Sequence, residues 1–285
     1  MIKNDVIVTF VGMFAAIGAV LATVSMGLAQ SQRTAIDRTV PLHAPDESTI
    51  PEGPVGAAVG YGKKVLTNTQ TYARAYVGNG LNCSSCHLDA GRRAYSAPWV
   101  GLWGMFPEYR SRNGQVNALQ ERINDCFERS MNGKPLPYDS AEMRGILAYI
   151  WWLSRDVPTG VAVKGRGFAR VRMSRPADPQ RGESVYAQKC ATCHGADGQG
   201  RRGPNGEYLF PALWGPGSFN IGAGMARLSN AAGFVKANMP LGQGATLNDA
   251  DAIDVAAYFI RQPRPDFPAK THDWPKGSKP DDAPY

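Results

Sequence analysis

The chain has 285 residues, of which 43% are hydrophobic, so it is long enough for one large or two ordinary domains with real cores. Its formal net charge of +7 is spread along the sequence without a long basic run. This distribution argues against a nucleic-acid-binding protein and leaves acidic partners and anionic substrates open.

The N-terminal segment is apolar. Residues 6–29 contain no charged residue, Lys3 precedes them, and the small residues at 27–29 offer a cleavable end. The pattern predicts an export signal, but the run is also long enough for a membrane span, which needs about 20 residues. We therefore expect a cleaved signal peptide or a retained inner-membrane anchor at residues 1–29. Either one predicts a periplasmic location in a bacterium.

Two short motifs, CSSCH at residues 83–87 and CATCH at residues 190–194, account for four of the five cysteines. Cys-x-x-Cys-His is the attachment signature of c-type haem, in which the two thiols bind the porphyrin covalently and the histidine binds the iron. A zinc site or a pair of disulfides explains two such motifs in one exported chain less well. The residues expected to hold two covalent haem c groups are Cys83, Cys86 and His87, and Cys190, Cys193 and His194.

The surroundings of the two motifs repeat as well. A helix-like segment precedes each motif, and a Leu-Trp-Gly sequence follows it at residues 102–104 and 213–215. Each half then ends in an amphipathic helix, at residues 139–153 and 248–260. The duplication predicts an all-α fold with two class I cytochrome c domains in tandem, each wrapped around one haem.

Segments rich in Pro, Gly and Arg, without a sustained hydrophobic period, flank and separate the two halves. Asp139 with Glu142, and Asn248 with Asp251, have the spacing of capping boxes at the start of the two final helices. The predicted parts are a signal or anchor at 1–29, an irregular extension at 30–58, domain 1 at 59–155, a linker at 156–180, domain 2 at 181–263 and a C-terminal tail at 264–285.

The second iron needs a further ligand from a loop before the last helix. Met239 is favoured, because Pro240 disfavours helix at the preceding residue and lets the sulfur point toward the iron. Met225 is the rival ligand. A thioether ligand raises the reduction potential, so this haem is the expected exit for electrons.

The first iron has two candidate ligands, Met131 and Cys126. Met131 matches the position of Met239 in the other half. Residues 117–131 predict a helix, and at about 100° per residue Cys126 falls at the seam between an apolar arc and the side of the helix that carries Arg122 and Arg129. Position favours the methionine and helix geometry favours the thiol, so this reasoning leaves both open.

The segment "RINDCFERSMNGKPL" with a preceding CxxCH domain, and the segment "FPALWGPGSFNIGAGMARLSNAAGFVKANMPLG", resemble the dihaem thiosulfate dehydrogenase family over roughly residues 55–262. The resemblance implies that His87 and Cys126 bind the first iron, and His194 and Met239 the second. Some members ligate the second iron through a lysine at the position of Asn238, which asparagine cannot do.

The resemblance also implies an enzyme that oxidises two thiosulfate ions to tetrathionate and passes two electrons through the second haem to a periplasmic cytochrome or similar carrier. The implied catalytic residues are Cys126, Arg112, Arg122 and Ser130, and helical facing adds Arg129. Guanidinium groups suit a dianionic substrate. The haem potentials decide whether such an enzyme runs in reverse as a tetrathionate reductase.

Three alternatives remain at this point. A non-catalytic dihaem electron-transfer cytochrome predicts Met131 as the ligand of the first iron. A cysteine-ligated cytochrome subunit of a sulfur-oxidising complex requires a partner chain. A dihaem peroxidase needs a displaceable histidine, and the two spare histidines, His43 and His272, lie in segments expected to be irregular.

Overall fold

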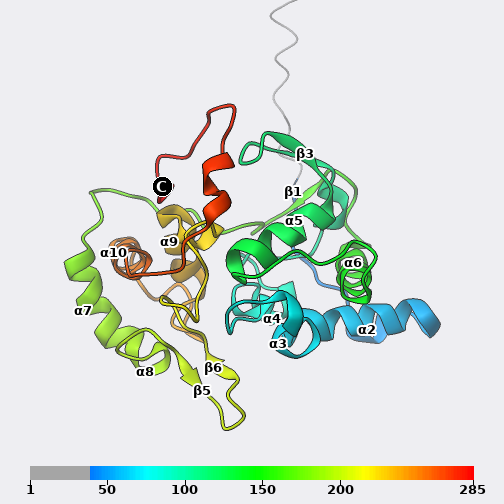
Figure 1. Cartoon of the computed structure of the whole chain (residues 1–285), viewed down its shortest axis with the longest axis horizontal. Helices are drawn as coiled ribbons and strands as arrows, with labels where there is room; N and C mark the ends of the chain where they lie inside the picture. Colours follow the sequence, from blue (N-terminus) through cyan, green and yellow to red (C-terminus); the bar gives the residue numbers. More distant parts are fainter. Residues whose placement is uncertain (1–38) are drawn as a thin grey trace, which may run out of the picture. The chain divides into compact units, whose positions relative to one another are not determined.

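Two groups of helices, one around each CxxCH motif, form the framework of the computed structural model, which describes residues 39–285 (Figure 1). The first group contains α2 (Gly53–Thr67), α3 (Thr69–Tyr72), η2 (Arg74–Tyr76), η3 (Cys83–Ser85), α4 (Leu88–Gly91), η4 (Trp103–Met105), α5 (Leu119–Asp125), η5 (Cys126–Ser130) and α6 (Ala141–Ser154). The second contains α7 (Pro179–Lys189), α8 (Ala191–His194), η6 (Gly224–Ala226), α9 (Leu228–Asn238) and α10 (Asp249–Ile260). The short helices η1 (Glu47–Thr49) and η7 (Pro268–His272) flank them.

Strands are few and short. The antiparallel pairs are β2 (Glu108–Arg110) with β3 (Gln115–Asn117), and β5 (Arg201–Arg202) with β6 (Tyr208–Phe210). One parallel pair joins β1 (Thr39–Val40) to β4 (Ala162–Val163). The predicted all-α architecture is therefore confirmed, with small hairpins added to it.

The same helix crossing occurs in both halves. A Cβ placed on Gly62 of α2 would lie 1.9 Å from the carbonyl oxygen of Gly145 in α6, and one on Gly182 of α7 would lie 2.0 Å from that of Asp254 in α10. Only glycine lets the two helices approach so closely. The predicted duplication is thus present in the packing as well as in the motifs.

The tryptophans correct one detail of the predicted repeat. Trp214 packs edge-on against Tyr258 at 5.9 Å, and its counterpart in the first half is Trp99, which packs edge-on against Tyr149 at 6.3 Å. Trp103, which the Leu-Trp-Gly motif pairs with Trp214, is 44% exposed. The motif therefore aligns residues that occupy different environments, because the loop between motif and tryptophan differs in the two halves.

The caps of the two final helices differ from each other. Asn248 caps α10 by accepting from the backbone N–H of Asp251 at 2.8 Å, as its spacing predicted. In α6 the cap is Ser140, which accepts from the N–H of Met143 at 3.1 Å, and not Asp139. Both residue types are strong N-caps, so the sequence offered two adjacent choices.

One helix begins earlier in the chain than expected. α2 begins at Gly53, inside the segment expected to be irregular, with Pro54 in its first turn. The signal or anchor expected at residues 1–29 lies outside the described residues. Over residues 39–285, no helix is both long enough and apolar enough to cross a membrane.

Each half has its own apolar core, and the two cores meet. The first contains Val59, Met143, Ile146 and Trp152 among others. The second contains most of α9 and α10, and it also takes in Leu81 and Met131 from the first half. Leu81 lies just before the first CxxCH motif, and Met131 lies five residues after Cys126. Both segments are therefore packed against the second half.

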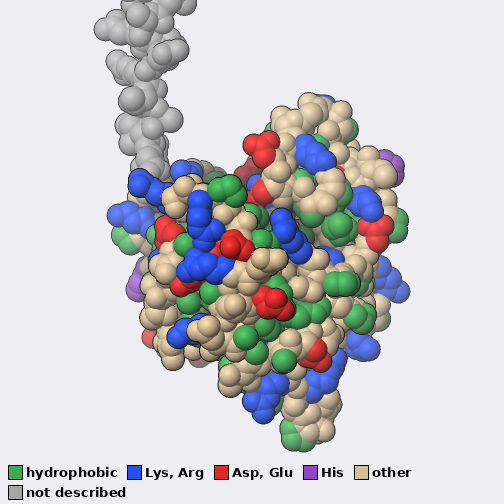
Figure 2. Space-filling model, turned by 90° about the vertical axis from the view of Figure 1, so that its left-hand side faces the viewer, with side chains coloured by type: hydrophobic (Ala, Val, Ile, Leu, Met, Phe, Trp, Pro, Cys, Tyr) green, Lys and Arg blue, Asp and Glu red, His purple; other side chains and the backbone are tan. Residues whose placement is uncertain are grey.

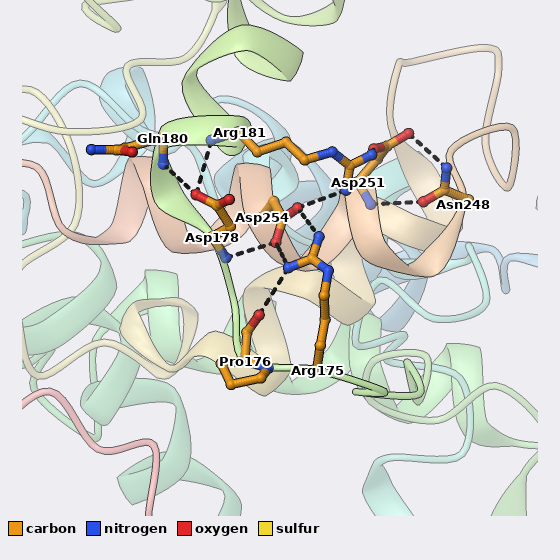
Figure 3. Close-up of polar contacts among 8 residues, drawn as sticks. All are labelled: Arg175, Pro176, Asp178, Gln180, Arg181, Asn248, Asp251 and Asp254. Atoms are coloured by element: carbon orange, nitrogen blue, oxygen red, sulfur yellow. Dashed lines mark hydrogen bonds and ion pairs between the residues drawn. The ribbon is translucent and has the colours of Figure 1, made fainter.

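The linker is attached to the second half by a buried carboxylate (Figure 3). The Asp254 side chain is fully buried and accepts hydrogen bonds from both Nη atoms of Arg175 and from Nη1 of Arg181. The backbone N–H of Asp178 donates to it as well, at 2.8 Å. This network holds residues 175–181 on α10.

The surface carries charges of both signs. Figure 2 shows Lys and Arg side chains interspersed with Asp and Glu side chains and with apolar ones on the face it presents. This mixture agrees with a positive charge that is spread along the sequence, and that face lacks the continuous basic surface that nucleic-acid binding uses.

Candidate active site

The two histidines of the CxxCH motifs are held in the same way. Nδ1 of His87 lies 2.7 Å from the carbonyl oxygen of Ala97, and Nδ1 of His194 lies 2.8 Å from that of Pro211. Because a carbonyl oxygen only accepts, each Nδ1 carries the proton and each Nε2 keeps its lone pair. Both rings thus have the tautomer that an iron ligand requires.

His87 lines a cavity of about 420 Å³ and His194 one of about 300 Å³, within the usual range for cofactor sites. Both cavities are walled mainly by apolar side chains, as a porphyrin ring requires. None of the five cysteines forms a disulfide, so the motif thiols are free for thioether bonds. The first cavity includes Leu66, Trp99, Phe106, Leu119, Ile146 and Ile150, and the second Tyr186, Phe210, Phe219, Phe234, Val255 and Phe259.

The two cavities share a wall. Leu81, Asn82 and Cys86 line both of them. This stretch of chain around the first motif is therefore in contact with both haem sites.

The helix that carries Cys126 changes its winding at this residue. α5 ends at Asp125, and η5 is a turn of π-helix in which the N–H of Met131 donates to the carbonyl of Cys126 at 2.9 Å. The sequence predicted one continuous α-helix over 117–131. A π turn has more residues per turn than an α-helix, so side chains beyond Cys126 are rotated away from their predicted directions. Such turns are frequent at functional sites.

Cys126 lies in the first cavity next to a guanidinium group. Nη1 of Arg122 donates to its Sγ at 2.9 Å. Burial raises the pKa of this thiol, but the charge of Arg122 and the imidazole of His87 outweigh burial and lower the pKa to about 7. The thiolate in turn raises the pKa of Arg122. The guanidinium of Arg122 therefore favours the thiolate form of Cys126, which is the form that binds metals and attacks sulfur.

Ser130 and Met131 line the same cavity. Met131 is 3% exposed and packs into the core of the second half. The structure thus brings both candidate ligands of the first iron to the cavity. Of the two, Cys126 is the one that accepts a hydrogen bond from Arg122 and interacts with His87.

The other two predicted arginines lie elsewhere. Nη1 and Nη2 of Arg129 each donate to the carboxylate of Asp273 at 2.8 Å. Nη1 of Arg112 lies 3.9 Å from the same carboxylate, and its guanidinium lies over the ring of Trp274 at 5.1 Å. Neither lines the first cavity. The π turn rotates Arg129 away from the cavity, and the C-terminal tail supplies the carboxylate that holds it.

The sequence missed three charged residues that line the first cavity, Glu108, Arg110 and Arg166. Glu108 lies between the two arginines, 2.9 Å from Nη1 of Arg110 and 3.5 Å from Nη2 of Arg166. Arg166 belongs to the predicted linker and carries no local signal. Arg110 stands near Arg112 in the sequence, and only the β2–β3 hairpin reveals which of the two lines the cavity.

Met239 follows α9 directly in an extended conformation, as Pro240 predicted. It lines the second cavity together with its rival Met225. Asn238 donates through Nδ2 to the carbonyl oxygens of Tyr95 and Phe234, each at 3.1 Å.

Two helical halves, each with a cavity, an oriented histidine and a free CxxC pair, define a protein with two tandem c-type cytochrome domains. The family model described as SoxA/TsdA, cytochrome c domain, matches residues 68–159. The model described as cytochrome C oxidase, cbb3-type, subunit III, matches residues 177–259. The predicted fold class is confirmed, and the chain carries two covalently bound haem c groups.

Similar proteins define the family more narrowly. A thiosulfate dehydrogenase of Psychrobacter arcticus is 47% identical over 241 residues, which cover 85% of this chain and 74% of that protein. One of Allochromatium vinosum is 44% identical over 239 residues, covering 82% and 88%. The solved thiosulfate dehydrogenase TsdBA of Marichromatium purpuratum, as isolated, has a TM-score of 0.77 at 40% identity; the match covers 80% of this chain and 50% of that one. The chain belongs to the thiosulfate dehydrogenase family, as its motifs predicted.

Proposed function

We propose that this chain is a thiosulfate dehydrogenase that joins two thiosulfate ions into tetrathionate. The observation that carries the proposal is the 2.9 Å contact between Arg122 and Cys126 inside the His87 cavity. A thiolate beside a guanidinium is suited to a sulfur oxyanion, whereas a haem that only carries electrons needs neither group. Membership of the thiosulfate dehydrogenase family supports the same substrate.

The residues that would hold the two irons are His87 and Cys126 in the first cavity, and His194 and Met239 in the second. The haem groups supply two one-electron acceptors, one in each half. A thioether ligand raises the potential of the second site relative to a thiolate-ligated first site. In a one-electron couple, about 59 mV changes the equilibrium tenfold, so a modest difference directs electrons toward the second site.

Arg122 binds and orients the dianionic substrate, because its guanidinium stays charged and donates in a planar fork. Ser130 donates a hydroxyl hydrogen bond, and Arg110 and Arg166 add positive charge to the same cavity. In the reaction the sulfane sulfurs of two thiosulfate ions form one S–S bond and two electrons leave; no bond breaks and no proton is released. We assign no substrate contact to Arg112 and Arg129, which the tail residues Asp273 and Trp274 hold outside the cavity.

The electrons leave through the second cavity to a periplasmic carrier, such as a soluble c-type cytochrome. The wall that Leu81, Asn82 and Cys86 share between the cavities supports a direct path to that exit. The apolar run at residues 6–29 supports export, with membrane attachment only if the run is retained. The same groups serve the reverse reaction, tetrathionate reduction, when the potentials favour it.

Replacement of Cys126 by methionine tests the proposal. The variant Cys126→Met keeps a sulfur ligand and both haem groups, yet its turnover of thiosulfate with ferricyanide should fall by about a hundredfold or more, since the thiolate is lost. Electron paramagnetic resonance of the oxidised wild-type protein should show one thiolate-ligated low-spin haem. Met131→Leu is the matched control and should keep both the signal and the turnover. Near-wild-type turnover of Cys126→Met would contradict the proposal.

A non-catalytic dihaem electron carrier is the second candidate. The observation that favours it is the presence of Met131 in the lining of the first cavity. It predicts thioether ligation at both irons and no turnover of thiosulfate with ferricyanide. A cytochrome subunit of a sulfur-oxidising complex would instead purify with a partner chain.

The ligand of the second iron is tested by a pair of substitutions. Met239→Leu should abolish the red absorption band typical of thioether-ligated ferric haem, because leucine offers no lone pair. Met225→Leu should leave this band in place and cost only packing in the second core, about 1 kcal/mol. The opposite pattern would assign the ligand to Met225.

A further inference from the structure

The turn that carries Cys126 is closed by donors from outside its own helix. The last four carbonyl groups of a helix have no partner within it. Here all four, from Glu128 to Met131, accept hydrogen bonds from distant segments. The bonds run from Asn220 Nδ2 to Glu128 O (2.8 Å), from Asn220 N to Arg129 O (3.1 Å), from Asn79 Nδ2 to Ser130 O (2.9 Å) and from Gly78 N to Met131 O (2.9 Å).

The two asparagines that make these bonds are fixed in place. Asn79 is 6% exposed and Asn220 is 1% exposed. The Oδ1 of Asn79 accepts from the N–H of Leu81 at 3.1 Å, and the Oδ1 of Asn220 accepts from the N–H of Gly222 at 3.0 Å. These bonds fix the orientation of each amide, so that its Nδ2 group points at the turn. Turning the amide over would exchange oxygen and nitrogen and lose both hydrogen bonds.

The segment before the first CxxCH motif lies directly against the end of the turn. A Cβ on Gly78 would be 1.9 Å from the carbonyl oxygen of Asn132, and a Cβ on Gly133 would be 2.0 Å from that of Tyr76. Such contacts leave no room for the turn to shift. The position of the Cys126 turn is therefore coupled to the segment that leads into Cys83.

We propose that Asn79 and Asn220 are positioning residues that hold the Cys126 turn in its π-helical form and so fix the Cys126 sulfur relative to Arg122 and the first iron. The inference rests on the proposed role of Cys126. An α-helical turn would pair the carbonyl of Cys126 with the N–H of Ser130 and not with that of Met131. External donors to the carbonyls of residues 128–130 hold the turn at its observed winding, because each donor belongs to a buried segment outside the helix that fixes where the carbonyl must lie.

The inference also connects the two haem sites. Asn220 follows Phe219, which lines the second cavity, and Asn79 bridges the turn to the same loop by donating to the carbonyl oxygen of Ser218 at 3.0 Å. The loop of residues 218–220 therefore lies between the second cavity and the turn of Cys126.

The variant Asn220→Asp tests the inference in the holoenzyme. Aspartate keeps the size of the side chain and the acceptor for Gly222, but it places an oxygen in front of the Glu128 carbonyl where a donor is required. The thiolate signal of the first haem in electron paramagnetic resonance should split or lose intensity. We expect kcat with thiosulfate and ferricyanide to fall by about tenfold or more, as small misplacements do, while KM changes less because Arg122 precedes the turn. The spectrum of the second haem should stay unchanged.

Asn79→Ala and the milder Asn220→Ser extend the test if Asn220→Asp does not fold, and both should change the thiolate signal in the same direction. Asn248→Ala is the control, since it removes the cap of α10 and lowers stability without touching the turn. A wild-type thiolate signal and kcat in folded Asn220 and Asn79 variants would overturn the inference alone. The absence of any thiolate signal in the wild-type protein would overturn the proposed role of Cys126 and the inference with it.

Discussion

The three cysteines of the first half acquire two kinds of chemistry from their immediate neighbours. Burial raises the pKa of Cys83 and of Cys86 to about 12, whereas Arg122 and His87 bring that of Cys126 to about 7. The first two belong to the CxxCH motif and are the thiols that attach the haem covalently. Cys126 alone among the three has a cation within hydrogen-bonding distance that keeps its thiolate stable.

At the residue scale, Arg122→Gln is the most informative change. Glutamine retains a donor but loses the charge, so the thiolate of Cys126 and the bound oxyanion both lose a charge-assisted hydrogen bond of about 1.5–3 kcal/mol. We expect kcat/KM for thiosulfate to fall by about ten- to a hundredfold. Arg144→Gln, at an exposed position of α6, is the control. Equal activity of the two variants would show that Arg122 does not contact the substrate.

At the scale of elements, the crossing of α2 and α6 places the first haem site. Gly62 lies at the contact, while Gly60, two residues away, has no atom within 4 Å of an added Cβ. The same helix therefore contains a glycine that packing requires and one that it does not.

We predict opposite effects of alanine at these two positions. Gly62→Ala should lower the free energy of unfolding by about 3 kcal/mol, because its methyl group overlaps the backbone of α6. Gly60→Ala should raise it by about 0.5–1 kcal/mol through helix propensity. Urea denaturation of the holoprotein, followed by circular dichroism, measures both. Destabilisation of equal size in the two variants would contradict the close crossing.

The haem-binding halves were predicted from the sequence, and the arginines that line the first cavity only in part. The CxxCH motifs place attachment and ligation within five consecutive residues, so no long-range information was needed to find them. Arg122 lies one helical turn from Cys126 and was also predicted. The positions of the Arg129 and Arg166 side chains could not be read from the sequence, because they depend on Asp273 and Glu108, which are far away in the sequence.

At the scale of the whole molecule, the buried carboxylate of Asp254 makes stability depend on pH. Burial raises the pKa of Asp254, but the hydrogen bonds from Arg175 and from the N–H of Asp178 lower it by more than burial raises it. The net pKa is therefore below the usual value of about 3.9. A carboxyl group with a lowered folded pKa stabilises the protein above its unfolded pKa. This contribution is lost as the pH falls through the folded pKa.

Asp254→Asn should therefore lower the free energy of unfolding by about 2 kcal/mol at pH 7. This figure already allows for solvent screening, because Arg175 and Arg181 are both partly exposed. The difference from the wild type should stay constant between about pH 7 and pH 5 and shrink below about pH 4. Asp156→Asn, in an exposed pair with Arg155, is the matched control and should change stability by less than about 1 kcal/mol. A difference between wild type and Asp254→Asn that does not change with pH would exclude the assigned role.

The sequence by itself determined that this protein has two helical halves with one covalent haem each, and that a fifth cysteine lies next to an arginine. These features are local, since each depends on residues within one motif or one helical turn. The tertiary structure decided that Trp99, and not Trp103, is the counterpart of Trp214. It also decided that the helix widens at Cys126 and that the second half bonds to this turn through Asn220. Those features arise where segments distant in the sequence supply the carboxylates and donors that a neighbouring helix cannot provide.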